Sequence, residues 1–279
     1  MIQKEIKEGA RFEFGKNWER FISCLNEERI KIAEKSLCNM LMCDDLKGKS
    51  FIDVGCGSGL FSLAAVRLEA EYVYSFDYDP QSVSCCLKLK NLFFSNISRW
   101  MIEEGSVLDE DYLKSLGTFD VVYSWGVLHH TGAMWRALEN VSLLVKNGGK
   151  LYISIYNDQG KISQVWRAVK IAYNKLPTGF KFLILWPAFV GFWGLTMIKD
   201  ILRGKPFYTW RNYSRKSTRG MSFYYDVIDW IGGFPFEVAK PEEIFNFYRN
   251  KGYILEKLKT CGGKIGCNEF VFTLSNQNK

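Results

Sequence analysis

The segment Phe51–Leu60, FIDVGCGSGL, constrains the fold more than any other part of this 279-residue chain. A short apolar run contains Asp53, and three alternating glycines then lead into a helical stretch. Glycine lets the backbone turn tightly and lets a ligand lie against it, while a helix start offers unpaired N–H groups. The spacing is G-x-G-x-G, and Leu60 stands where a dinucleotide-binding fold has its last glycine. This segment predicts a strand, a tight turn and a helix that together bind a small ligand.

Strands and helices alternate around this segment. We expect strands at 51–54, 72–76, 107–108, 119–124 and 151–156, and helices at 16–43, 60–68, 81–94 and 134–145. Near the end of the chain, Pro241 starts a helix, and two strands at 253–258 and 269–274 flank a Gly262-Gly263 turn. The alternation predicts an α/β fold with a mostly parallel sheet, helices on both faces and a ligand at the strands' carboxyl ends.

The glycine segment resembles motif I of class I S-adenosylmethionine-dependent methyltransferases. Further matches follow in chain order: Asp77 at the end of the second strand, the turn at Gly105, the segment FDVVYSW at 119–125 and the turn NGGKL at 147–151. The V-L-x-H segment at 127–130 is similar to that of ubiquinone-biosynthesis-type O-methyltransferases. The resemblance covers about residues 48–156 and 241–275, and it implies a Rossmann-like, seven-stranded, mostly parallel sheet.

The same resemblance implies S-adenosylmethionine as the cofactor. In that family the glycines face the methionine part, a nearby acid orients its amino group, and a second acid accepts the ribose hydroxyls. Ser106 stands where the family has an acid on the adenine amino group, which leaves the backbone contact of Val107. We therefore expect a cofactor site made of Asp53, Gly55, Cys56, Gly57, Gly59, Asp77, Tyr78, Ser106, Val107, Ser124 and Trp125. Trp18 is expected either in a lid over the cofactor or as a core anchor.

The two histidines of the chain, His129 and His130, are adjacent. A neutral imidazole titrates near working pH, so His130, and with less reason His129, is a candidate general base. The alternative is that both side chains only hold the following helix start. Methyl transfer to an anionic nucleophile depends mainly on positioning, which favours the alternative.

Aromatic residues are concentrated between the fifth strand and the last helix. Residues 157–239 contain 18 of the 44 aromatic residues, including five of the nine Trp. Within this region, 199–219 carries seven Lys or Arg and one acid, interleaved with aromatic residues. We expect an inserted cap over the active site, with Asn157, Arg211, Tyr213, Arg219, Tyr225 and Asp226 as candidate substrate contacts.

The expected organisation has four parts: an N-terminal helical segment (1–47), a cofactor-binding core (48–156), the cap (157–239) and the last helix with a hairpin (240–279). The favoured function is O-methyl transfer to a small or lipid-linked acceptor. An RNA methyltransferase using 199–219 is the first alternative, because bases stack on aromatic rings beside basic side chains. An inactive cofactor-binding interaction module is the second.

Charge and cysteine usage indicate where such a chain works. The net charge of +7 permits an anionic partner without requiring one. The eight cysteines form no C-x-x-C pair and the histidines are few, so we expect free thiols, no metal site and a cytoplasmic protein. The uncharged run 182–198 reaches the lower edge of membrane-spanning length and contains Pro187 and two glycines. A buried or interfacial segment, with peripheral membrane contact, is favoured over a spanning helix.

Overall fold

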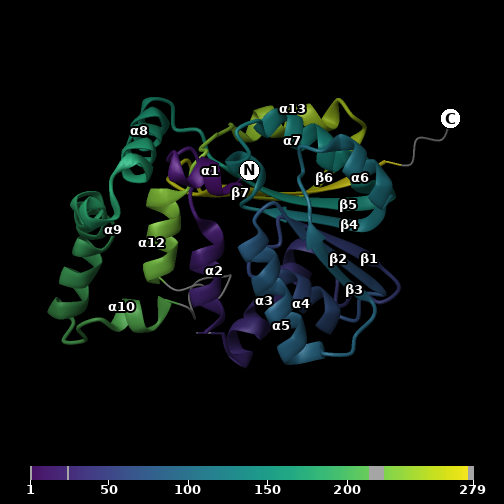
Figure 1. The fold of residues 1–279 in the computed structure, drawn as a ribbon, viewed down its shortest axis with the longest axis horizontal. Coiled ribbons are helices and arrows are strands. Elements are labelled where there is room, and N and C mark those ends of the chain that lie inside the picture. The colour runs from purple at the N-terminus through teal and green to yellow at the C-terminus, as the bar shows by residue number, and fades with distance from the viewer. Residues whose placement is uncertain (1, 24, 214–222, 276–279) are drawn as a thin grey trace.

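Seven strands form one sheet in the order β3-β2-β1-β4-β5-β7-β6 (Figure 1). The computed structural model describes residues 2–23, 25–213 and 223–275. Strands β1 to β5 pair in parallel, and β7 runs antiparallel to β5 and β6. The expected seven-stranded, mostly parallel Rossmann-like sheet is therefore confirmed. The strands are β1 Ser50–Val54, β2 Tyr72–Asp77, β3 Trp100–Glu104, β4 Phe119–Trp125, β5 Val145–Tyr156, β6 Tyr253–Lys259 and β7 Cys267–Leu274.

Helices cover both faces of the sheet, and each face has its own apolar core (Figure 1). One face packs against α3 Glu27–Leu41, α4 Leu60–Arg67 and α5 Pro80–Phe94. The other packs against α6 Glu110–Leu116, α7 Met134–Val141 and α13 Pro241–Arg249. The chain changes face between β1 and β4, so the carboxyl ends of these neighbouring strands border a crevice where ligands bind in such folds.

Three expected element boundaries differ from the structure. The helix predicted at 16–43 is two helices, α2 Phe14–Ile22 and α3, because the Asn26 side chain accepts a hydrogen bond from Arg29 N (3.0 Å) and starts a new helix. The third strand lies at 100–104 instead of 107–108, where the chain turns at Ser106. Strand β5 begins at Val145, so helix α7 ends four residues earlier than predicted.

Among the described residues, four α-helices lie between β5 and α13 and form what we call the helical arm: α8 Lys161–Lys175, α9 Phe182–Leu202, α10 Tyr208–Arg211 and α12 Phe223–Gly232. The arm stands beside α1 Ile2–Lys7 and α2, and α9 lies at its outer edge (Figure 1). A third apolar cluster joins the arm to the N-terminal segment through Phe12, Tyr173, Val227 and Ile231. The N-terminal segment thus lies between the arm and the sheet.

Candidate functional site

The turn after β1 is built so closely that only glycine fits it. Gly55 and Gly57 have φ of +79° and +53°, in the left-handed region that side chains disfavour. A Cβ on Gly55 would stand 2.4 Å from a methyl group of Val127, and one on Gly57 would stand 2.9 Å from the indole nitrogen of Trp18. The bare backbone therefore forms a surface that a ligand can approach closely.

A buried carboxyl group, that of Asp53, and a half-buried one, that of Asp77, lie beside this turn. Asp53 accepts a hydrogen bond from the Ser62 hydroxyl (2.5 Å), and Asp77 accepts one from Gly57 N and one from Asp79 N (both 2.9 Å). Burial raises the pKa of Asp53 to about 7 and the pKa of Asp77 to about 6. Removal from water disfavours the ionised form of a carboxyl, and a positively charged ligand would favour it. The pair therefore suits a cationic ligand.

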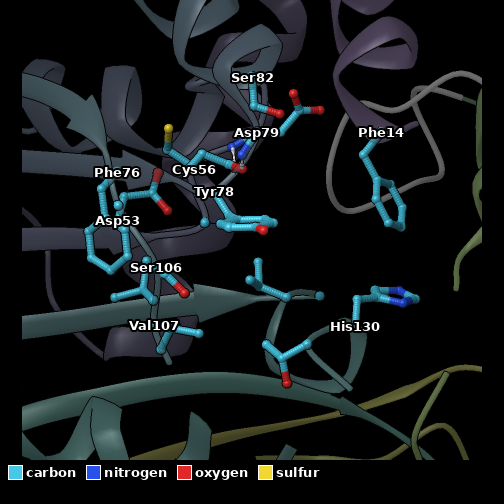
Figure 2. A pocket seen from close by; sticks show the side chains of 18 of the residues that line it. Phe14, Asp53, Cys56, Phe76, Tyr78, Asp79, Ser82, Ser106, Val107 and His130 are labelled. Carbon is cyan, nitrogen blue, oxygen red and sulfur yellow. Dashed lines mark hydrogen bonds between the residues drawn. The ribbon is translucent and has the colours of Figure 1, made fainter. Parts of the chain in front are cut away.

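A cavity of about 800 Å³ opens at the carboxyl ends of β1, β2 and β4 (Figure 2). Its volume is in the range of cofactor and small-molecule sites. The predicted residues that line it are Asp53, Gly55, Cys56, Gly57, Asp77, Tyr78, Ser106, Val107, Trp125, Trp18 and His130. The fold thus brings together eleven predicted residues from five separate segments of the chain.

The N-terminal segment closes one side of this cavity. Arg11 pairs with Glu5 (Nε to Oε2, 2.6 Å), donates to the backbone oxygen of His130 (3.1 Å) and lies 5.1 Å from the ring centre of Tyr78. Tyr78 in turn donates to Glu5 (3.2 Å). Sequence reasoning missed Glu5 and Arg11, because no spacing pattern links the first helix to the end of β2. The missed lining residues also include Ile2, Phe12, Thr131 and Arg136.

The two histidines occupy different environments. His130 lines the cavity, and its Nδ1 lies 2.6 Å from the carbonyl oxygen of Pro235. Because a carbonyl can only accept, Nδ1 carries the proton and Nε2 keeps its lone pair. Burial, followed by the charge of Lys170, lowers the pKa of His130 to about 3, so the ring is neutral at working pH. His129 is fully buried 4.0 Å from the ring of Tyr156 and does not line the cavity.

Two predicted cofactor residues have structural positions instead. Ser124 is fully buried within the sheet, where its hydroxyl donates to the backbone oxygen of Val54 (3.0 Å). Gly59 starts α4, and a Cβ there would stand 2.6 Å from the Cys86 sulfur. Both residues support the turn from behind, and neither lines the cavity.

Those predicted substrate residues that the structure describes do not line the cavity either. The Asn157 side chain pairs with Asn268 (3.0 Å) at the end of the β5–β7 ladder. Arg211 ends α10, and the Tyr213 ring packs 5.4 Å from the Trp193 ring, both in the helical arm. Arg219 lies outside the described residues, as do the side chains of Tyr225 and Asp226. No described residue of 157–239 lines the cavity, so in the described chain the N-terminal segment takes the place expected for the cap.

Residues 52–151 match the family model described as a methyltransferase domain. Residues 52–151 are a methyltransferase domain within a sheet of the class I fold. Among solved structures, magnesium protoporphyrin IX methyltransferase from Synechocystis PCC 6803 with bound S-adenosylhomocysteine resembles it with a TM-score of 0.51 at 16% identity. That match covers 90% of this chain and 89% of the other, and it shows a shared fold.

Curated relatives of the methyltransferase domain match over shorter stretches. A ribosomal protein L11 methyltransferase of Photobacterium profundum is 37% identical over 123 residues, which are 43% of this chain and 38% of the relative. A ubiquinone biosynthesis O-methyltransferase of Coxiella burnetii (strain Dugway 5J108-111) is 29% identical over 157 residues, or 56% and 61%. The chain therefore spans less than two thirds of the length of these relatives.

The match to a methyltransferase domain implies S-adenosylmethionine as the cofactor, and the residues present fit it. It carries positive charge on its sulfur and its amino group, which the carboxyls of Asp53 and Asp77 would balance. The glycine turn, Tyr78 and Val107 line the same cavity, and the Tyr78 ring could pack on the adenine of the cofactor. The cavity has volume for the cofactor together with part of a second molecule.

Proposed function

We propose that the protein transfers the methyl group of S-adenosylmethionine to an oxygen atom of a small or lipid-linked apolar acceptor. The observation that carries this proposal is one cavity with two kinds of wall. The carboxyls and glycines of the β1 and β2 turns form a polar floor. Aromatic side chains of the N-terminal segment, Phe12, Phe14 and Trp18, form an apolar wall, in which the Phe14 ring centre lies 5.0 Å from that of His130. A charged cofactor and an apolar acceptor can therefore meet in the same space.

The protein contributes mainly positioning. When bound, the cofactor supplies an electrophilic methyl group on a positively charged sulfur. The lone pair of His130 Nε2 can accept a hydrogen bond from an acceptor hydroxyl, but a group with a pKa of about 3 is a weak base. We therefore propose that His130, whose ring is held by the carbonyl oxygen of Pro235, orients the acceptor. We do not assign it the removal of a proton before methyl transfer.

An oxygen acceptor is supported by the relative named ubiquinone biosynthesis O-methyltransferase, which aligns over more of this chain than the ribosomal protein methyltransferase does. The RNA alternative rests on the basic and aromatic segment 199–219. Its described part, 199–213, does not line the cavity, and this favours a small acceptor.

The proposal is tested by incubating the full chain with methyl-labelled S-adenosylmethionine and a cell extract, then separating lipids, small polar molecules, RNA and protein. We expect label in the organic-soluble fraction. Label that enters only RNA or only protein would contradict the proposed acceptor class and identify RNA or protein as the acceptor. No label in any fraction would favour an inactive binding module.

The matched variants for this test are Asp77→Asn and Asp44→Asn. Asp77→Asn removes a charged acceptor of two backbone hydrogen bonds and should lower labelling by about tenfold to a hundredfold. Asp44 is exposed and does not line the cavity, so its variant should label as the wild type does.

A further inference from the structure

Helix α9 presents a continuous apolar face to solvent. Its exposed positions recur every three to four residues, as one side of a helix does: Phe182, Leu183, Trp186, Pro187, Val190, Gly191, Leu195, Ile198, Ile201 and Leu202. The side chains of Trp186, Leu195 and Leu202 are 67%, 73% and 81% exposed. Surface helices normally carry polar residues on this side, and single scattered apolar residues are what monomers expose. We call these ten residues the apolar stripe.

The opposite face of α9 is already occupied. Ile184, Leu185, Ala188, Phe189, Phe192 and Trp193 pack against the apolar cluster that contains Phe12, Tyr173, Val227 and Ile231. Segment 178–202 is the only candidate among the described residues that is long and apolar enough to cross a membrane. Because one side is held by the protein and the other is open, the arrangement suits a helix lying along a bilayer surface.

Charge around the stripe is almost entirely positive. Residues 159–213 contain nine Lys and Arg and one acid, Asp200. Asp200 is buried and accepts hydrogen bonds from the backbone and hydroxyl of Thr209 (2.7 and 2.9 Å), so its charge is turned inward. Exposed basic side chains stand at both ends of the stripe: Lys175 before it, and Lys199, Arg203, Lys205 and Arg211 near its end.

We propose that the apolar stripe docks on an anionic bilayer surface, with α9 lying in the plane of the headgroups. A helix of 21 residues gives a stripe about 30 Å long, enough for several apolar side chains to enter the acyl boundary together. The flanking cations then lie at the level of anionic headgroups, where each contributes attraction. Aromatic residues such as Trp186 favour this interface because their rings are apolar and their edges polar. The proposal does not depend on methyl transfer.

Vesicle flotation tests the docking. The full chain is mixed with vesicles of phosphatidylcholine containing about 30% phosphatidylglycerol, or with phosphatidylcholine alone. We expect strong flotation with the anionic vesicles, weaker flotation with the neutral ones, and partial release in about 0.5 M salt, where surface charges are screened. A chain that floats with neither vesicle contradicts the proposal.

Two double variants separate apolar docking from charge attraction. Trp186→Glu with Leu195→Glu should lower vesicle binding about tenfold or more, since both side chains would enter the bilayer. Lys199→Glu with Arg203→Glu should remove the preference for anionic lipid and leave the weak neutral binding. Leu92 and Ile254 are similarly exposed apolar residues on the sheet domain, at 71% and 56%, so Leu92→Glu with Ile254→Glu is the matched control and should float normally.

Each variant is also titrated with S-adenosylmethionine. A variant that binds the cofactor but not vesicles is folded and has lost only membrane docking. Equal flotation of the wild type and the Trp186→Glu, Leu195→Glu variant overturns the proposal. A second result would also overturn it. If sedimentation velocity shows that the wild type is a dimer that does not bind vesicles, and that this variant is a monomer, then the apolar stripe is a dimer interface.

Discussion

At the scale of single residues, the site depends on carboxyl groups kept away from water. Asp53 is 3% exposed, and its nearest polar partner is a neutral hydroxyl of Ser62. The sequence predicted both acids, Asp53 near the end of β1 and Asp77 at the end of β2. It could not predict the pKa values, because these depend on how deeply the N-terminal segment buries the cavity floor.

This burial makes cofactor affinity dependent on pH. Asp53 has to be ionised to balance the positive charge of S-adenosylmethionine, and burial raises its pKa to about 7. The affinity for S-adenosylmethionine should therefore rise by about tenfold between pH 6 and pH 8, because over this range the Asp53 carboxyl of the ligand-free protein becomes ionised. Titration calorimetry across this range measures the effect, and Asp53→Asn should flatten the pH dependence. A wild-type affinity that is constant over this range contradicts the raised pKa.

His130 makes folding stability depend on pH in a different range. Its pKa is lowered in the folded chain, so the unfolded chain binds more protons below pH 6.5. The contribution of His130 to the free energy of unfolding is therefore fully present above pH 6.5 and is lost as the pH falls toward 3. In this range the free energy of unfolding falls by at most about 1.4 kcal/mol per pH unit. Urea unfolding at pH 7, 6 and 5 measures this slope. His130→Asn has no imidazole to protonate and can still donate to Pro235, so its slope should be smaller by this amount.

At the scale of elements, strands with a clear apolar run were predicted well, and those with mixed composition were not. The buried strands β1 and β4 show their boundaries in the sequence. Strand β3, WMIEE, has two exposed residues and two acids, so the sequence pattern placed the third strand too late, at Val107. The length of α9 was not foreseen because Pro187 lies inside the helix, where a proline removes a backbone hydrogen bond and normally kinks or ends a helix.

The glycine turn gives a prediction at this scale. Gly55→Ala places a methyl group against Val127, and Gly48→Ala places one in open space at a similar φ of +64°. The strained backbone should lower the free energy of unfolding of both variants by about 1 kcal/mol. The contact with Val127 should lower that of Gly55→Ala further. Thermal unfolding compares the two. Val127→Ala added to Gly55→Ala should recover part of the difference, and no recovery would contradict steric contact as the cause.

At the scale of the whole molecule, the site is completed by contacts between distant parts of the chain. Residues near position 11 close the cavity over segments near 78 and 130, and Phe12 also packs on the helical arm at Gly232. The sequence showed an N-terminal lid and an aromatic insertion as separate predictions. Their joint packing is a long-range contact with no local pattern, and this is why the insertion was expected over the cavity and not beside the lid.

Arg11 connects these parts. Arg11→Ala removes its ion pair with Glu5, its hydrogen bond to His130 and its contact with Tyr78. We expect faster tryptic cleavage within the first ten residues and cofactor affinity weaker by about tenfold. Lys16→Ala, which removes an exposed ion pair with Glu13, is the control and should change neither. An Arg11→Ala chain as resistant and as tight-binding as the wild type would show that the N-terminal wall is held by other contacts.

The most direct test of the central claim is calorimetric titration of the full chain with S-adenosylmethionine. We predict one site per chain and an affinity that Asp77→Ala lowers by about a hundredfold, because the variant removes a carboxylate from the cavity floor. Asp44→Asn should bind as the wild type does. A folded chain that binds no S-adenosylmethionine, or an Asp77→Ala variant that binds it equally well, would contradict the account.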